Sequence, residues 1–231
     1  MRSGKYTVTA RRLAALLLIC TMPLLLFACS EKTEKETTMP ATFYDGPNPI
    51  VTFEMEDGSI IKAELYPAKA PNTVKNFISL VSSGYYDGKV FHRAVADFMI
   101  QGGSSDGTSS GQFPYCIPGE FTNNGFAQND IKHTPGVLSM ARAGAPYGVD
   151  PKPYNNSASS QFFIVDGDRA AGLNGDYAAF GKVIEGLDVV HRIARSPASG
   201  EMLVNPVKMV KVTVDTLGGT FDEPVTLPPL R

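Results

Sequence analysis

Hydrophobic and polar residues alternate along two adjacent segments, residues 50–56 and 59–65, on either side of the dipeptide Asp57-Gly58. Alternation is typical of a half-buried strand, because successive side chains of a strand point to opposite faces. Asp-Gly between two such runs favours a two-residue turn of type I′. The pattern therefore predicts a β-hairpin that turns at Asp57-Gly58.

The hydrophobic period changes after Pro71, since apolar residues recur at steps of three and four from Val74 to Val81. This spacing gives an apolar stripe on one face of a helix. Proline is favoured in the first turn of a helix, and glycine just past the last, so Pro71 and Gly84 mark its ends. A second short helix is predicted over residues 187–194, again with its apolar residues on one face.

The rest of this region consists of short apolar runs separated by turn residues, which predict further strands. They are expected at residues 90–94, 98–102, 136–141, 161–165, 178–183 and 207–214. Many short strands with two helices indicate a mainly β domain, either a closed antiparallel barrel or a sandwich. Closure favours the barrel because it removes exposed strand edges, but spacing alone leaves both open.

The N-terminus has the organisation of an export signal. Four basic residues and no acidic residue precede an apolar segment, residues 13–27, that is shorter than the roughly 20 residues of a membrane span. It ends in Leu26-Phe27-Ala28-Cys29, which resembles the bacterial lipobox, where cleavage before the cysteine is coupled to acylation of its sulfur. We expect lipidation of Cys29; secretory cleavage nearby and an uncleaved anchor are the alternatives. The pair Arg11-Arg12 fits a twin-arginine signal poorly.

Residues 30–40 are polar and of mixed charge, which predicts a flexible spacer because such a segment buries too little apolar surface to order. The expected organisation is a signal peptide at 1–28, a tether at 29–46, one globular domain at 47–218 and a loose tail at 219–231. The protein is then an exported, membrane-anchored lipoprotein that faces the extracytoplasmic side.

Cysteine usage and charge narrow the possible partners. Cys20 would leave with the signal and Cys29 would carry lipid, so Cys116 remains alone and no intramolecular disulfide is possible. Loss of residues 1–28 removes four of the 21 Lys and Arg and none of the 23 Asp and Glu, which leaves 17 against 23 and a net charge of −6. This balance argues against nucleic acid as a partner. Nothing in the sequence demands more than a monomer.

The motifs that carry chemistry lie between residues 91 and 183. They read FHR at 91–93, FM at 98–99, QGG at 101–103, GVLSMA at 136–141, SSQFFI at 159–164 and FGKV at 180–183. In type and order they resemble the signature of the cyclophilin-type peptidyl-prolyl isomerases, over residues 50 to 217. The resemblance implies a closed eight-stranded antiparallel barrel capped by two α-helices. It also implies a reaction without cofactor or metal, because no covalent bond is made or broken.

The resemblance also implies a groove for proline-containing peptides. Arg93 would be the catalytic donor at the prolyl nitrogen or the moving carbonyl, and Gln101 would hydrogen-bond the substrate backbone beside it. The substrate-binding residues would be Phe98, Met99, Ala141, Arg142, Phe163, Leu173 and Tyr177. Without the motif, core packing explains the two phenylalanines and Met99 equally well. His92 is expected to be a structural histidine hydrogen-bonded in the barrel wall rather than an acid-base residue.

Three positions and one loop depart from the common family pattern. Arg142 stands where many members have asparagine, and Tyr177 where many have histidine. Gly172 stands where many eukaryotic members carry the tryptophan that binds cyclosporin, so we expect weak affinity for that inhibitor. The loop at residues 144–159 is about ten residues longer than usual. It either gates access to the groove or is an insertion without a role.

Two functions follow from these observations. The first is an active isomerase that assists the folding of exported proteins, for which slow X-Pro rotation is limiting. The second is a non-catalytic proline-peptide-binding chaperone or assembly module. Retention of both Arg93 and Gln101 favours the enzyme, since a pure binder has little need of a charged donor aimed at a prolyl nitrogen. A solute-binding lipoprotein is disfavoured because two alternating α/β lobes are lacking.

Overall fold

The computed structural model describes residues 44–111 and 113–230. The predicted signal, Cys29 and the tether as far as residue 43 therefore lie outside the described residues. Within them, nine strands form one sheet. The strands are β1 (Ile50–Met55), β2 (Ile60–Leu65), β3 (Val90–Val95), β4 (Met99–Gly102), β5 (Val137–Met140), β6 (Phe162–Val165), β7 (Ala179–Glu185), β8 (Ala198–Ser199) and β9 (Met202–Asp215).

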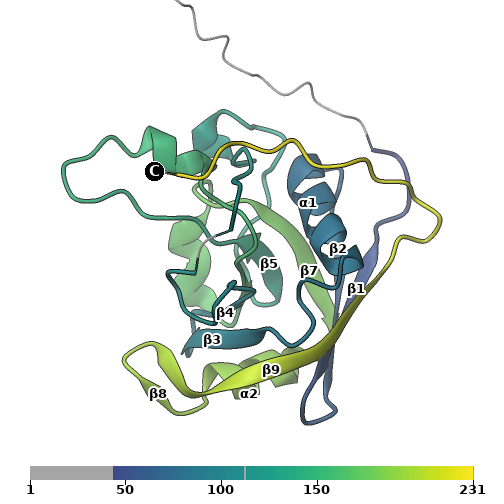
Figure 1. The fold of residues 1–231 in the computed structure, drawn as a ribbon, viewed down its shortest axis with the longest axis vertical. Coiled ribbons are helices and arrows are strands. Elements are labelled where there is room, and N and C mark those ends of the chain that lie inside the picture. The colour runs from purple at the N-terminus through teal and green to yellow at the C-terminus, as the bar shows by residue number, and fades with distance from the viewer. Residues whose placement is uncertain (1–43, 112, 231) are drawn as a thin grey trace, which may run out of the picture. The chain divides into compact units, whose positions relative to one another are not determined.

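The sheet closes on itself. Its strand order is β1-β2-β7-β5-β6-β4-β3-β9-β8, and β1 pairs in addition with β9. Every pairing is antiparallel. Eight strands thus form a ring, and β8 only extends the end of β9 (Figure 1). The predicted eight-stranded barrel is confirmed, and the sandwich is excluded.

The predicted hairpin forms, but its turn differs from the expected type. Type I′ needs a positive φ at both central residues, whereas only Gly58 has one, at 80°. The amide of Gly58 donates to the carbonyl of Met55, and the amide of Met55 donates to the carbonyl of Ser59. The loop therefore has three residues with a left-handed glycine in the last position. The Asp57 carboxylate stabilises it by accepting from the amide and hydroxyl of Ser59.

Both predicted helices are present and lie toward opposite ends of the barrel in Figure 1. Helix α1 spans Pro71–Ser82 and α2 spans Leu187–Ala194. Gly84 follows α1 with φ of 73°, as expected for a residue that ends a helix. Three short 3-10 helices, η1 (Thr122–Asn124), η2 (Lys152–Asn156) and η3 (Asp168–Leu173), were not expected.

For strand β9, the local hydrophobic pattern predicts the wrong start. It begins at Met202, five residues before the predicted start, and turns back on β8. This hairpin brings residues 201 and 202 beside β3, where Met202 pairs with Arg93. The sequence gives little sign of it because residues 204–206 are exposed and do not alternate.

The core has two parts, which meet at β6. Phe162 and Ile164 belong to the barrel interior, together with the apolar faces of α1 and α2. Phe163 and Val165 belong to a second cluster with Met99 on the outer side of the barrel wall. All four residues of β6 are consequently buried. This outer cluster forms the base of the candidate site.

After β9 the chain does not end loosely, contrary to the expectation for the tail. It runs back over α1 toward the loop at residues 144–159 (Figure 1). The backbone of Val225 is hydrogen-bonded by the side chain of Asn72, and Leu227 pairs with Cys116. Residues 221–230 are thus part of the folded unit.

Among the residues that the structure describes, no helix has both the length and the apolar character needed to cross a membrane.

Candidate active-site groove

The β3–β4 hairpin brings Arg93 and Gln101 together. They are eight residues apart in sequence but directly opposite in register, as are Val95 and Met99. Residues opposite each other on one face of an antiparallel pair have neighbouring side chains. Gln101 is also opposite Phe163 of β6. One row of cross-strand neighbours therefore runs from Arg93 through Gln101 to Phe163.

The turn of this hairpin depends on an unusual backbone at Asp97, which has φ of 62°. Aspartate tolerates this left-handed conformation better than most residues. The amide of Asp97 donates to the buried carboxylate of Asp166 at 2.6 Å, and the amide of Asp166 donates to the carbonyl of Phe98 at 2.9 Å. These bonds fix the turn, so Phe98 and Met99 enter β4 at the edge of the outer cluster.

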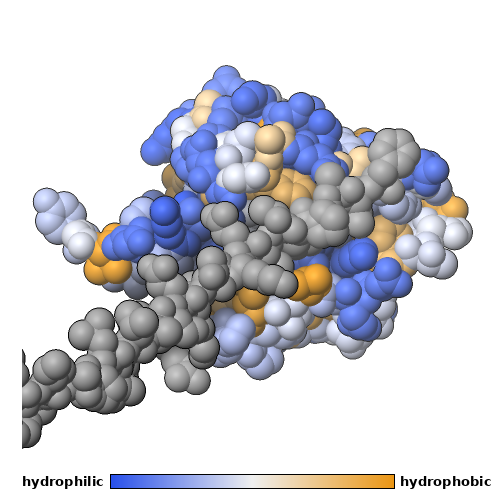
Figure 2. All heavy atoms as spheres, turned by 90° about the horizontal axis from the view of Figure 1, so that it is seen from above, coloured by the Kyte–Doolittle hydropathy of each residue, from blue (hydrophilic) through white to orange (hydrophobic). Residues whose placement is uncertain are grey.

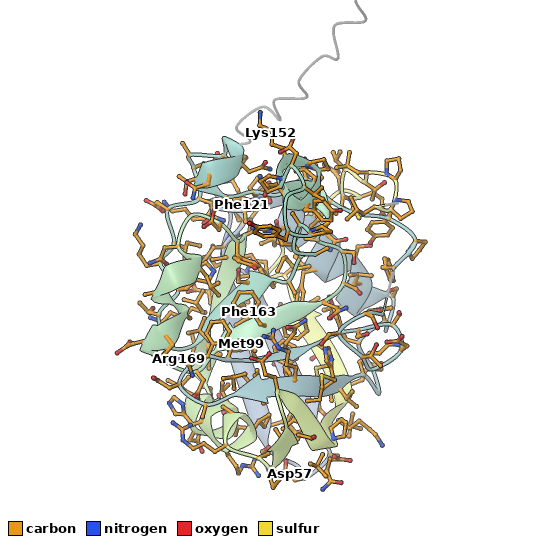
Figure 3. The ribbon with its side chains drawn as sticks, turned by 90° about the vertical axis from the view of Figure 1, so that its left-hand side faces the viewer. Asp57, Met99, Phe121, Lys152, Phe163 and Arg169 are labelled. Atoms are coloured by element: carbon orange, nitrogen blue, oxygen red, sulfur yellow. The ribbon has the colours of Figure 1, made fainter. Side chains whose placement is uncertain are left out.

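A hollow of about 590 Å³ opens over this part of the wall. All nine residues predicted for the groove line it, together with five that were not predicted: Ser109, Ala143, Gly144, Glu201 and Met202. The predicted nine are Arg93, Phe98, Met99, Gln101, Ala141, Arg142, Phe163, Leu173 and Tyr177. Figure 3 looks onto this face and shows Met99 and Phe163 close together at its centre. Tertiary structure thus gathers residues from six segments of the chain into one site: 93–101, 109, 141–144, 163, 173–177 and 201–202.

Arg93 is held in place from two sides. Its Nη1 donates to Oε1 of Gln101 at 2.7 Å. Its Nε and Nη2 lie 2.8 and 2.6 Å from Oε2 of Glu201, in the β8–β9 hairpin. Of the five N–H bonds of a guanidinium, these contacts use three. Two therefore remain for a ligand in the hollow, as far as the described residues show.

Glu201 was missed in the sequence. An acidic residue 108 positions after Arg93 has no local pattern that connects the two, and the connecting hairpin was not predicted. One local sign exists, Gly200, which forms the two-residue turn between β8 and β9 together with Glu201.

Gln101 continues the network inward. Its Nε2 donates to Oε1 of Gln161 at 2.9 Å, and Nε2 of Gln161 donates to the carbonyls of Ser109 and Gly111 at 3.2 and 3.0 Å. Because Gln101 is 7% exposed, these bonds fix its rotamer. A polar strip from Glu201 to Gly111 therefore crosses the hollow beside its apolar cluster.

Arg142 occupies the rim opposite Arg93. Its guanidinium lies 4.6 Å from the ring centre of Tyr177 and 5.6 Å from that of Phe121, and its Nε donates to the carbonyl of Asp176 at 3.0 Å. Stacking of a guanidinium on aromatic rings is favourable and restricts its motion. Arg142 and Tyr177, two of the three residues expected to depart from the common pattern, thus stabilise each other.

Two buried histidines lie behind the groove. His133 stacks on Phe163 with ring centres 5.9 Å apart, and its ring nitrogens contact Asn174 and Ser139. Burial lowers the pKa of His133. Burial and the charge of Arg93 lower the pKa of His92. His92 is fully buried, which fits a structural role, but neither ring nitrogen has a hydrogen-bond partner among the described residues, so the expected hydrogen bond is absent.

A second, smaller hollow of about 320 Å³ adjoins the groove. The two share Gln101, Ala141 and Arg142 in their walls. The far side of the second hollow is formed by Cys116 and, unexpectedly, by Pro229 and Leu230 of the C-terminal tail. The two hollows therefore meet along the wall that these shared residues form.

The long loop at residues 144–159 begins at the groove and then leaves it. Gly144 lines the main hollow, whereas Tyr147 is fully exposed. The loop protrudes on the left in Figure 1 and again in Figure 2, which looks at the molecule from above. Lys152, at the start of η2, lies at the top of the face in Figure 3, away from Met99 and Phe163.

No group of three or more His, Cys, Asp or Glu side chains within residues 44–111 and 113–230 is arranged to hold a metal ion. The hollow offers the guanidinium groups of Arg93 and Arg142, the carboxylate of Glu201, amide and hydroxyl groups, and an apolar surface.

Comparison with known proteins gives a consistent result. Residues 50–214 match the family model described as cyclophilin type peptidyl-prolyl cis-trans isomerase/CLD. Peptidyl-prolyl cis-trans isomerase B of Bacillus subtilis is 40% identical over 152 residues, which cover 66% of this chain and 95% of that protein. Peptidyl-prolyl cis-trans isomerase B of Escherichia coli is 35% identical over 144 residues, covering 62% and 83%.

Solved structures agree. A cyclophilin type peptidyl-prolyl cis-trans isomerase of Cryptosporidium parvum, crystallised in the presence of the dipeptide Ala-Pro, is 28% identical with a TM-score of 0.59. The match covers 72% of this chain and 98% of that one. The matched region in the family model ends at residue 214, before the C-terminal tail.

Proposed function

The chain belongs to the cyclophilin-type peptidyl-prolyl cis-trans isomerases and is an enzyme of that activity, and from this premise we propose how its groove acts and where it works. The substrates are proline-containing segments of exported proteins. The active groove is the hollow around Arg93, and the enzyme reaches its substrates from a lipid anchor at Cys29.

The barrier to be lowered is electronic. Resonance gives the peptide bond partial double-bond character, with a rotation barrier of about 18 to 20 kcal/mol. In the twisted state the prolyl nitrogen becomes pyramidal and exposes a lone pair. A donor that meets this lone pair only in the twisted state stabilises the transition state more than the ground state. The Ala-Pro dipeptide present with the Cryptosporidium parvum relative supports a substrate of the X-Pro type.

Arg93 is the proposed donor. Glu201 and Gln101 hold three of its N–H bonds, and two are left for a substrate among the contacts that the structure describes. The fixed guanidinium need not reorganise as the bond twists, so its full interaction is available in the transition state. This geometry is the observation that carries the mechanism.

The apolar cluster holds the proline ring while the preceding carbonyl swings. Met99 and Phe163 form its base, and Phe98 and Leu173 pack against it from the sides. Gln101 retains one amide N–H for a substrate carbonyl within the contacts that the structure describes. Ala141, Arg142 and Tyr177 form the opposite rim.

Replacement of Arg93 tests this mechanism against a peptide-binding module that lacks turnover. In an assay of cis-to-trans conversion of a short X-Pro peptide, the full-length Arg93→Ala variant should lose at least about tenfold in kcat/KM, equivalent to about 1.4 kcal/mol. Arg169→Ala is the matched control, because it removes the same charge from an exposed position outside the groove. Normal turnover by a folded Arg93→Ala variant contradicts the assigned role. Absence of turnover in the parent would favour the binding module.

The anchor is supported by the sequence alone. The polar segment that follows Cys29 is long enough to separate the barrel from a membrane surface. An isomerase held there meets exported chains as they emerge unfolded, when X-Pro rotation limits their folding.

Cys29→Ser tests the anchor in a bacterium that makes lipoproteins. We expect the wild-type chain to incorporate a labelled fatty acid and sediment with membranes, whereas the variant does neither. Cys116→Ser is the control, because Cys116 is buried in the folded domain and should not affect labelling. A Cys29→Ser chain that still carries label would overturn the proposal.

A further inference from the structure

The C-terminal tail, residues 221–230, lies beyond the region that matches the family model, yet it reaches the second hollow beside the proposed groove. Within its last residues, Pro229 and Leu230 line the second hollow together with Gln101, Ala141 and Arg142. The proposed catalytic groove shares those three residues. A segment outside the common fold thus forms a wall next to the site of reaction.

The tail is held by specific bonds rather than by chance contact. The side-chain amide of Asn72 donates to the carbonyl of Val225 at 3.0 Å, and its oxygen accepts from the amide of Val225 at 2.7 Å. Asn72 is 1% exposed, so this pair of bonds is shielded from water. Such an arrangement satisfies both backbone groups of Val225 and fixes the direction of the chain.

Two residues further on, Leu227 forms a β-bridge with Cys116. Each backbone amide donates to the other residue's carbonyl, at 2.8 and 2.9 Å. Cys116 is itself part of the wall of the second hollow. The bridge therefore places Pro229 and Leu230 at the hollow directly, because only one residue separates Leu227 from Pro229.

The same bridge connects the tail to the long loop. Ile117, next to Cys116, pairs with Ala158 at the end of that loop. Ser157 and Ser159, on either side of Ala158, also line the second hollow. Tail and loop are thus joined through residues 116–117 and form one rim.

We propose that Pro229 and Leu230, held by the bridge at Leu227, form a specificity-determining wall of the second hollow beside the active groove, which discriminates against substrates with bulky side chains near the proline. This rests on the proposed function, because it takes the groove around Arg93 as the reacting site. An extended peptide advances about 3.3 Å per residue. A substrate with its proline on Met99 and Phe163 reaches the second hollow within two or three residues.

Pro229 and Leu230 discriminate between substrates by the size of the side chain that enters the second hollow. Pro229 and Leu230 present apolar, non-ionisable surface, and proline restricts the backbone, so the wall does not yield easily to a large side chain. Small side chains do not reach Pro229 and Leu230, whereas a large side chain that extends across the second hollow meets them. Differences of one to several methylene groups in an apolar pocket change discrimination by about 10- to 200-fold.

The test measures kcat/KM of the full-length chain on short X-Pro peptides in which the residue two positions before, or two positions after, the proline is glycine, alanine, leucine or tryptophan. It compares the parent with a chain that ends at Thr226 and with the double variant P229G/L230G. The truncated chain keeps the Asn72–Val225 bonds. The double variant also keeps the bridge between Leu227 and Cys116. It therefore tests the side chains at 229 and 230 without removing the contacts that hold the tail on the domain.

In one of the two peptide series, kcat/KM of both variants should rise about tenfold on the leucine and tryptophan peptides. On the glycine and alanine peptides it should change less than twofold. Asp222→Ala is the matched control, because it alters the same tail at its contact with Lys75, 3.5 Å away, and leaves the wall intact. An unchanged ratio of bulky to small substrates in both variants overturns the proposal, and so does an equal gain on all peptides. The Arg93→Ala variant tests the catalytic assignment independently. If the parent's activity is lost in that variant, the assignment holds, and an unchanged substrate ratio then contradicts the wall alone.

Discussion

At the scale of single residues, Glu201 fixes the orientation of the Arg93 guanidinium. Its carboxylate holds Nε and Nη2 of that arginine, and its own side chain is 57% exposed. An exposed ion pair contributes up to about 1 kcal/mol. Because the contact orients the proposed catalytic donor, Glu201→Ala should lower kcat about two- to fivefold and leave KM nearly unchanged.

Glu201→Gln separates positioning from charge. Its amide oxygen still accepts a hydrogen bond from Arg93, so we expect it to recover most of the lost kcat. A change in KM alone, or equal losses in both variants, would show that Glu201 does not position Arg93.

His133 makes stability depend on pH. Its lowered pKa means that the unfolded chain binds a proton more readily than the folded chain. The contribution of neutral His133 to the free energy of unfolding is complete above the ordinary histidine pKa of about 6.5. It is lost as pH falls below that value. Buried His92 has the same sign. Burial raises the pKa of Glu120, so its contribution has the opposite sign and is lost as pH rises.

The His133→Gln variant isolates this effect. The free energy of unfolding, measured between pH 8 and pH 5, should fall less steeply in the variant than in the wild type. Parallel curves for the two proteins would rule out His133 as the source. Glu120 is present in both the wild type and the variant, so its opposing contribution cancels when the two free energies of unfolding are subtracted.

At the scale of elements, the start of α1 depends on a residue far away in sequence. Ala70, which precedes the helix, offers no side-chain cap. The Glu120 carboxylate instead accepts from the amides of Asn72 and Thr73 at 2.9 and 2.7 Å, and from the Thr73 hydroxyl at 2.7 Å. It satisfies amides that the first turn of a helix leaves unpaired.

Glu120→Ala should therefore lower the free energy of unfolding by about 2 to 3 kcal/mol. Chemical denaturation measures this directly. Glu120→Gln retains an acceptor oxygen and should lose less than the alanine variant. A loss below about 0.5 kcal/mol in the alanine variant would mean that α1 needs no cap from this segment.

The element η3 carries the position that departs most from the common family pattern. A side chain added at Gly172 meets no atom within 4 Å at its Cβ, and Leu173 beside it lines the groove. Gly172→Trp should bind cyclosporin about tenfold more tightly than the wild type, because it supplies the large aromatic contact that this chain lacks. Inhibition of peptide isomerisation measures the change. Gly172→Ala, the control, should match the wild type; equal inhibition of all three proteins contradicts the expectation.

At the scale of the whole molecule, one aromatic core joins the barrel and its helices. The ring of Phe53 on β1 lies 5.6 Å from that of Phe162 on β6 and 6.4 Å from that of Phe77 on α1. All three are fully buried. Strands and helix therefore share contacts that neither retains without the other, which favours a single cooperative unfolding transition.

Phe53→Ala should lower stability by about 3 to 5 kcal/mol while the domain still unfolds in one step. Far-ultraviolet circular dichroism and tyrosine signals should shift together. Phe221→Ala is the control, since that ring is partly exposed, stacks on Tyr44 and packs only at the edge of the core. Separate transitions for the two signals would indicate that barrel and helix unfold independently.

Local signals in the sequence were sufficient for most elements. Alternation identified β1 and β2, and the three-to-four spacing after Pro71 identified α1, because these periods reflect which face of an element is buried. The motifs predicted nine residues that the structure gathers around one hollow. Register explains one part of this, because a hairpin that turns at Asp97 must bring Arg93 opposite Gln101. The turn at Asp57-Gly58 was assigned the wrong type, because the bond from Gly58 to Met55 sets the loop length.

The tertiary structure decided the contacts between segments that are distant in sequence. The ion pair of Arg93 with Glu201, the cap of α1 by Glu120 and the bonds of Asn72 to Val225 each join residues at least 47 positions apart. No periodic pattern encodes such pairs, because they depend on how closed strands and crossing loops meet in space. The sequence by itself determined the fold and the groove of this protein, whereas its three-dimensional packing determined how Arg93 is held and what walls the groove.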